Sequence, residues 1–124
     1  MSTYPPPEDI LDAVARFLRD EAAPVLKGSA AFNLRVSLNA IELVRRELTL
    51  GAAAEAKERA GLEKLLGEDG NLDTLRETLC DRLAAGDLTL EDAALRDHLR
   101  AVAIERLAID QPSYSAYIAA TREP

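Results

Sequence analysis

Four polar side chains within one predicted helix are the strongest candidates for a binding site in this sequence. Their spacing of i, i+4, i+7 and i+11 places them in a narrow arc, because successive residues of an α-helix are about 100° apart. Arginine and asparagine are directed hydrogen-bond donors, and arginine binds carboxylate or phosphate through two bonds. The arc is either a seam that meets a partner or ligand, or the solvent face of an otherwise buried helix. The four residues are Arg35, Asn39, Glu42 and Arg46.

A second candidate lies near the C-terminus, around Asp110 and Tyr114. An aspartate two residues before Pro112 is typical of a turn, which is the simpler interpretation. Tyr114 and Tyr117, however, are three residues apart in a chain with only 4% aromatic residues. Aromatic side chains are enriched in the cores of protein interfaces. We therefore treat Asp110 and Tyr114 as a docking candidate.

The remaining reactive residue types do not assemble into a catalytic or metal-binding pattern. His98 is the only histidine and Cys80 the only cysteine, so neither a zinc cluster nor an internal disulfide is expected. Cys80 lies past the middle of its predicted helix, away from the N-terminus that would lower a thiol pKa. The sequence also lacks a glycine-rich phosphate loop and a kinase-like catalytic loop. We expect no catalytic residues, no metal and no cofactor.

The charge balance limits the classes of partner. The formal net charge is −7, and an acidic chain repels nucleic acid and anionic membranes. No apolar run approaches the roughly 20 residues of a membrane span, and residues 1–7 lack the pattern of a signal peptide. A cytoplasmic protein that binds neither nucleic acid nor membrane is expected.

Helical periodicity predicts the elements that position these residues. The chain shows no strict alternation of apolar and polar residues, so we predict an all-α fold, a single-domain bundle of four to five helices. Asn71 and Gly86 are expected to cap one helix, and Thr89 with Asp92 to open the next. The predicted organisation is an extended proline-rich arm over 1–7, a bundle over 8–112 and a tail over 113–124 with one helical turn near 114–120. Helices are expected over 8–23, 30–50, 52–66, 72–85 and 90–109, with Pro24, Gly51 and Pro112 as stops.

An ordered set of segments resembles a family of small bacterial helical proteins of unknown function. The set is PEDILDAV at 7–14, FNLRVSLNA at 32–40, Leu79-Cys80 followed by Gly86, and LAIDQPSY at 107–114. It covers nearly the whole chain, although no single motif is diagnostic. Proteins of this family accompany an aminoglycoside-phosphotransferase-like kinase and an acyl-CoA dehydrogenase, and one is similar to the small subunit of the two-part kinase of levulinate catabolism.

The resemblance implies an accessory role. The chain would bind and activate a kinase subunit that holds ATP and Mg²⁺ and phosphorylates a hydroxyacyl-CoA. Arg35 and Asn39 would contact the kinase or its substrate, with Asp110 and Tyr114 second. Two alternatives stay open: a helical module that binds acyl-CoA by itself, and a small independent enzyme. A homodimer is compatible with each.

Overall fold

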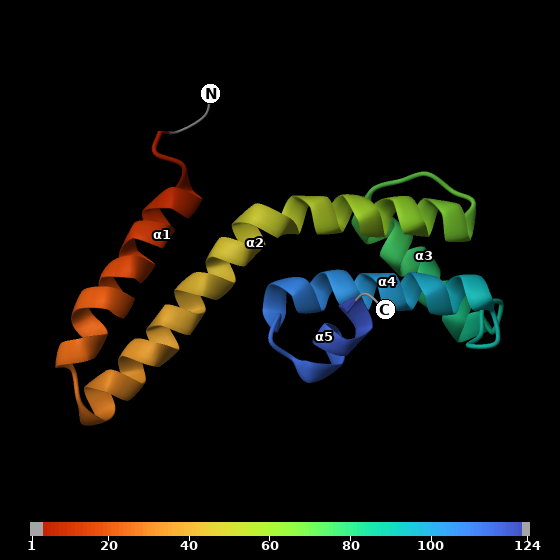
Figure 1. The fold of residues 1–124 in the computed structure, drawn as a ribbon. Coiled ribbons are helices and arrows are strands. Elements are labelled where there is room, and N and C mark those ends of the chain that lie inside the picture. The colour runs from red at the N-terminus through yellow and green to blue at the C-terminus, as the bar shows by residue number, and fades with distance from the viewer. Residues whose placement is uncertain (1–3, 123–124) are drawn as a thin grey trace. The chain divides into compact units, whose positions relative to one another are not determined.

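The fold is all-α, as the sequence predicted. The computed structural model describes residues 4–122, and within them 82% of the structure is helical, with five α-helices and no strand. Figure 1 shows the helices in chain order. Their bounds are α1 Pro7–Phe17, α2 Gly28–Leu66, α3 Leu72–Ala85, α4 Ala93–Asp110 and α5 Ser115–Thr121.

The chain divides into two compact units, Met1–Gly51 and Ala52–Pro124. The sequence predicted one bundle over 8–112 and did not indicate this division. The N-terminal unit holds α1 and the first part of α2. The C-terminal unit holds the rest of α2 together with α3, α4 and α5. Each unit therefore has to be understood from its own packing.

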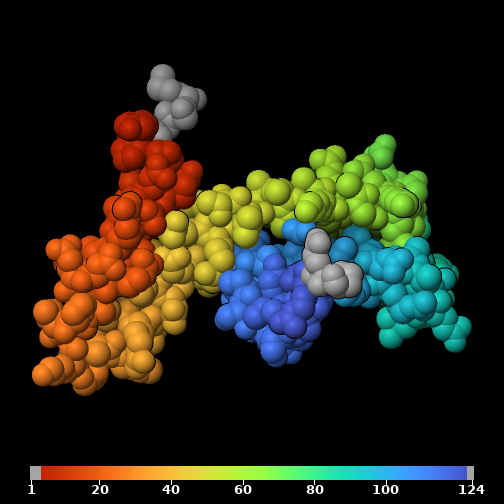
Figure 2. All heavy atoms as spheres, in the orientation of Figure 1, coloured from red at the N-terminus to blue at the C-terminus, as the bar shows by residue number. Residues whose placement is uncertain are grey.

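The N-terminal unit is a pair of antiparallel helices, formed by α1 and residues 28–50 of α2 (Figures 1 and 2). We call it the helix pair. Pro7, expected at the end of the extended arm, is instead the first residue of α1, where its missing amide hydrogen costs nothing. Residues 1–3 of that arm lie outside the described part of the chain. The predicted first helix reaches Pro24 through a π-helical turn, Leu18–Ala22, and a 3-10 turn, Ala23–Val25.

Helix α2 runs through Gly51, which was predicted to be a helix stop. Glycine inside a helix costs only about 1 kcal/mol relative to alanine, and Gly51 is followed by three alanines, the best helix formers. The two helices predicted over 30–50 and 52–66 are thus one helix.

The core of the C-terminal unit is aliphatic. Leu62 and Leu66 of α2 pack with Leu75 of α3, and all three are buried. The partly buried Leu72, Leu79 and Leu88 surround this cluster. Leu95 and Ile109 of α4 are also buried. The leucine cluster thus joins α2 to α3, and α4 contributes two further buried aliphatic side chains.

The predicted caps of α3 are confirmed. The Asn71 side chain accepts a 2.8 Å hydrogen bond from the backbone N–H of Thr74. At the other end Gly86 has φ 79°, a left-handed conformation that favours glycine. The backbone N–H of Asp87 then donates to the carbonyl of Arg82 at 2.9 Å.

Helix α4 begins later than predicted, at Ala93 instead of Leu90. The expected pair does form in part, because the Asp92 carboxylate accepts a 2.8 Å hydrogen bond from the backbone N–H of Thr89. The Asp92 N–H, however, bonds to the Thr89 carbonyl, which closes a turn instead of a first helical turn. The pair therefore stabilises the turn before α4.

Candidate functional site

Apolar side chains form an exposed line on the side of α2 that faces away from α1. Taking Leu34, which is buried, as the inward direction, these residues lie about 160–200° around the helix, by the 3.6-residue turn. Between 38% and 58% of each is exposed. We call this line the outer stripe; its residues are Phe32, Val36, Leu43 and Leu50. Single exposed apolar residues are ordinary, but an aligned set marks a candidate interaction surface.

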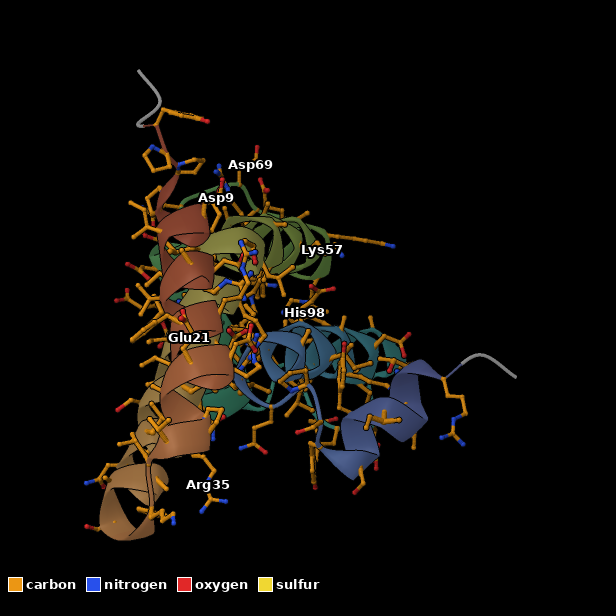
Figure 3. The ribbon with its side chains drawn as sticks, turned by 60° about the vertical axis from the view of Figure 1, so that its left-hand side comes forward. Asp9, Glu21, Arg35, Lys57, Asp69 and His98 are labelled. Carbon is orange, nitrogen blue, oxygen red and sulfur yellow. The ribbon has the colours of Figure 1, made fainter. Side chains whose placement is uncertain are left out.

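Three of the four polar residues predicted from the sequence lie beside the outer stripe. Arg35 and Asn39 are exposed, and Figure 3 shows the Arg35 side chain projecting away from the helix. Arg46 is half-buried. Glu42 points toward the α1 side and accepts hydrogen bonds from Arg45 at 2.9 and 3.1 Å. Arg35, Asn39 and Arg46 thus border the outer stripe. Glu42 belongs instead to a separate set of ion pairs.

That set joins α1 to α2 along one side of the helix pair, and we call it the charge row. Nη2 of Arg45 lies 3.3 Å from Oδ1 of Asp12. The other carboxylate oxygen of Asp12 lies 2.9 Å from Nη2 of Arg16. At the other end Glu42 lies 3.5 Å from Arg19. Arg45 was not predicted as a site residue, although it falls on the same helical line as Leu34, Leu38 and Ile41, an unusual place for a charge. The charge row is compatible with only one register of the two helices, and as a partly exposed set of ion pairs it adds modestly to their pairing.

The second candidate pair, Asp110 and Tyr114, lies in the C-terminal unit. Asp110 accepts two hydrogen bonds from Arg106, at 2.6 and 2.8 Å, and closes α4. Tyr114 precedes α5 and is half exposed. Asp110 therefore forms a local ion pair with an arginine one helical turn away. Tyr114 leaves part of its aromatic ring exposed.

A cluster of titratable groups in the C-terminal unit was not predicted. Arg76 of α3 donates to both carboxylate oxygens of Glu58 on α2, at 2.6 and 2.8 Å. These hydrogen bonds are the main reason why the pKa of Glu58 is lowered and that of Arg76 raised. His98 of α4 (Figure 3) is half-buried, and burial lowers its pKa while the negative charge of Glu58 opposes that effect. Spacing along the sequence could not reveal the cluster, because its members come from three helices.

The burial of His98 predicts a stability that falls as the pH falls. With a folded pKa below the ordinary 6.5, His98 takes up its proton more readily in the unfolded chain. Stability is therefore greatest above about pH 6.5 and is lost as the pH falls through the folded pKa. Urea unfolding between about pH 7.5 and about pH 5 should show this loss, and NMR should place the imidazole pKa below 6.5.

His98→Gln is the matched control for this prediction. It should flatten the pH dependence between about pH 7.5 and about pH 5. Glu58 acts in a different window: its pKa is lowered below 4.5, so its contribution is lost only as the pH falls through that lower value. An unchanged slope in His98→Gln would contradict the assignment to His98.

The described residues, 4–122, contain no group of three or more His, Cys, Asp or Glu side chains arranged to hold a metal ion. None of the helices in this part of the chain combines the length and the apolar character needed to cross a membrane.

Comparison with known proteins places the chain among helical domains without an assigned activity. The chain belongs to the family described as a domain of unknown function, DUF6285, whose model matches residues 24–114. No curated protein and no solved structure matches it. The resemblance to a family of unknown function is thereby confirmed. The match covers α2, α3 and α4, and so includes the outer stripe and the Glu58–Arg76–His98 cluster.

Proposed function

We propose that this chain is a non-catalytic accessory subunit that binds and activates a phosphotransferase-like kinase acting on hydroxyacyl-CoA. The observation that supports the proposal is the outer stripe with Arg35 and Asn39 beside it. Apolar side chains bordered by arginine and amide donors have the composition of a protein interface. The partner class comes from the family resemblance, and ATP and Mg²⁺ would be held by the partner.

Leu43 is the residue on which docking should depend most. It lies in the outer stripe between Val36 and Leu50, with Asn39 and Arg46 each within one helical turn of it. Residues near the centre of an interface are better shielded from water than residues at the rim, and usually carry most of the binding energy. A charge placed at position 43 would be buried without a partner on binding.

The experiment is binding and turnover with the phosphotransferase-like protein of the same genome. The two chains are purified, mixed and assayed for complex formation and for ATP consumption with a 4-hydroxyacyl-CoA. We expect a stable complex with turnover that neither chain shows alone. Leu43→Glu should weaken binding at least about tenfold, which corresponds to about 1.4 kcal/mol. Arg35→Ala should lower the turnover of the complex.

Leu83→Glu is the matched control. Leu43 and Leu83 are 38% and 39% exposed, but Leu83 belongs to α3, in the C-terminal unit, and is not a residue of the outer stripe. Leu83→Glu should leave binding unchanged, and circular dichroism should show both variants to be folded. Absence of a complex, with kinase turnover independent of this chain, would refute the proposal. Binding of acyl-CoA by this chain alone would then favour the alternative of a stand-alone ligand-binding module.

A further inference from the structure

We propose that a second surface of the helix pair binds the same surface of another copy of this chain, so that two helix pairs form a four-helix bundle. We call this surface the side face. It is separate from the outer stripe, and the inference stands independently of any kinase partner. The side face comprises Ile10, Val14 and Phe17 of α1 and Ser37, Ala40, Val44 and Leu48 of α2.

On α1, the apolar residues cover more of the helix than contact with α2 requires. Leu11, Ala15 and Leu18 are buried or half-buried and face α2. Ile10, Val14 and Phe17 lie about 90° away from that direction by helical geometry. Each of the three nonetheless remains between 41% and 54% exposed. Half of the apolar arc of α1 therefore has no covering element within the N-terminal unit.

Helix α2 shows the same displacement. Leu34, Leu38 and Ile41 face α1, whereas Val44 and Leu48 lie about 40–80° to one side of that direction. Val44 and Leu48 are about half exposed. Ser37 and Ala40 complete this side of the helix and are small and uncharged.

The charge row shows that the two displaced sets lie on the same side of the helix pair. Asp12 of α1 pairs with Arg45 of α2, and Arg19 of the π-helical turn after α1 pairs with Glu42 of α2, along one side. The side-face residues of each helix lie on the flank opposite to its charge-row residues. Because both ion-paired flanks share one side of the antiparallel pair, both apolar flanks share the other. The Asp12–Arg45 pair also places Val14 and Val44 at nearly the same level.

This pattern is that of a four-helix bundle. In a bundle each helix packs against two neighbours, so its apolar arc points between them and not directly at one of them. The apolar arc of α1 is centred between the direction of α2 and the direction of the side face. The apolar arc of α2 is likewise centred between the direction of α1 and the side face. A second helix pair stacked on the side face would place all four arcs around one core.

Charge and area favour a second copy as the occupant. A symmetric contact places each residue opposite residues of the same face, and the side face carries no charge at its seven positions, so like charges do not meet across it. A net charge of −7 opposes the association of two copies in general, so self-association is expected only through an uncharged surface such as the side face. Residues 7–22 span about 24 Å of helix, and two adjacent helices are about 20 Å wide. Pairing would thus bury about 1,000 Å² in total, close to the lower bound for a specific interface.

The first experiment is the mass of the chain alone in solution, by light scattering and analytical ultracentrifugation. We expect about 27 kDa, twice the 13.5 kDa of one chain. Val14→Glu and Val44→Glu should each return the mass to that of a monomer. Val36→Glu is the control: Val36 is 53% exposed and Val44 48%, but Val36 belongs to the outer stripe, so this variant should remain a dimer. A monomeric parent chain, or a dimer that survives both side-face variants, would overturn the inference.

A cross-linking experiment guards against variants that fail to fold. In a Cys80→Ser background, which removes the exposed native thiol, single variants Val14→Cys and Val44→Cys are oxidised alone and as a mixture. A covalent dimer from either variant alone indicates pairing of like helices. A covalent dimer only from the mixture indicates that α1 of one copy lies over α2 of the other. No covalent dimer in any of the three would overturn the inference.

Discussion

Leu62→Ala is expected to lower the free energy of unfolding by about 3 kcal/mol, since deleting a buried leucine typically costs 2–5 kcal/mol. Leu62 is fully buried and packs with Leu66 and Leu75. Truncation to alanine therefore reduces the apolar surface that is buried on folding and leaves a cavity between α2 and α3. These helices are also joined by the Glu58–Arg76 ion pair, which limits their collapse into the cavity. Urea unfolding followed by circular dichroism measures the loss.

The control for Leu62→Ala is Leu83→Ala. Leu83 is a residue of α3 that remains partly exposed, so truncation there removes less buried surface and leaves no closed cavity. Its cost should stay below about 1 kcal/mol. Equal losses at the two positions would mean that the leucine cluster is not the core of the C-terminal unit.

The second large effect is an energetic coupling between Gly61 and His98. We expect Gly61→Ala to destabilise the protein when His98 is present and to stabilise it in a His98→Ala background. A Cβ at position 61 would lie 2.6 Å from Nδ1 of His98 and 3.0 Å from its Cε1. Gly61→Ala therefore forces the half-buried imidazole to move, at a cost of about 1 kcal/mol or more. In a His98→Ala background the obstacle is gone, and the same change should stabilise α2 by about 0.5–1 kcal/mol through helix propensity.

A double-mutant cycle measures this coupling directly. The four proteins are the parent chain, the two single variants and the double variant, and the expected interaction energy is about 1.5–2 kcal/mol. If Gly61→Ala were equally stabilising with and without His98, the imidazole would move freely and would not be packed against α2. The cycle thus tests whether the α2–α4 contact is close, independently of the pH dependence described above.

Local signals in the sequence were sufficient for most of the fold. The apolar spacing of Leu72, Leu75 and Leu79, with Asn71 before it and Gly86 after it, defined α3 with its observed bounds. Caps act within one turn of chain, so they can be read from neighbouring residues. The stop predicted at Gly51 was wrong because a glycine is found both at helix ends and inside helices, and which of the two applies depends on whether the flanking residues continue the helix.

The candidate sites were predictable only in part. The arc of Arg35, Asn39 and Arg46 follows from helical periodicity alone, and so does the line of apolar residues beside it. The Glu42–Arg45 pair follows from its i, i+3 spacing. The ion pairs of Arg45 with Asp12 and of Glu42 with Arg19 depend instead on how the first helix packs on α2. The Glu58–Arg76–His98 cluster joins residues up to 40 positions apart, and no spacing rule links such residues.

The sequence by itself determined that this protein is helical, where most of its helices end and which helix faces are apolar, because these properties depend on residues within a few turns of one another. The tertiary structure decided the division near Gly51, the role of Arg45 between two carboxylates and the burial of His98 over Gly61. It also decided which apolar residues stay exposed, since the amphipathic pattern of a helix gives the width of its apolar arc but not how much of that arc its neighbours cover. The outer stripe and the side face are the parts of those arcs that packing within the N-terminal unit leaves uncovered.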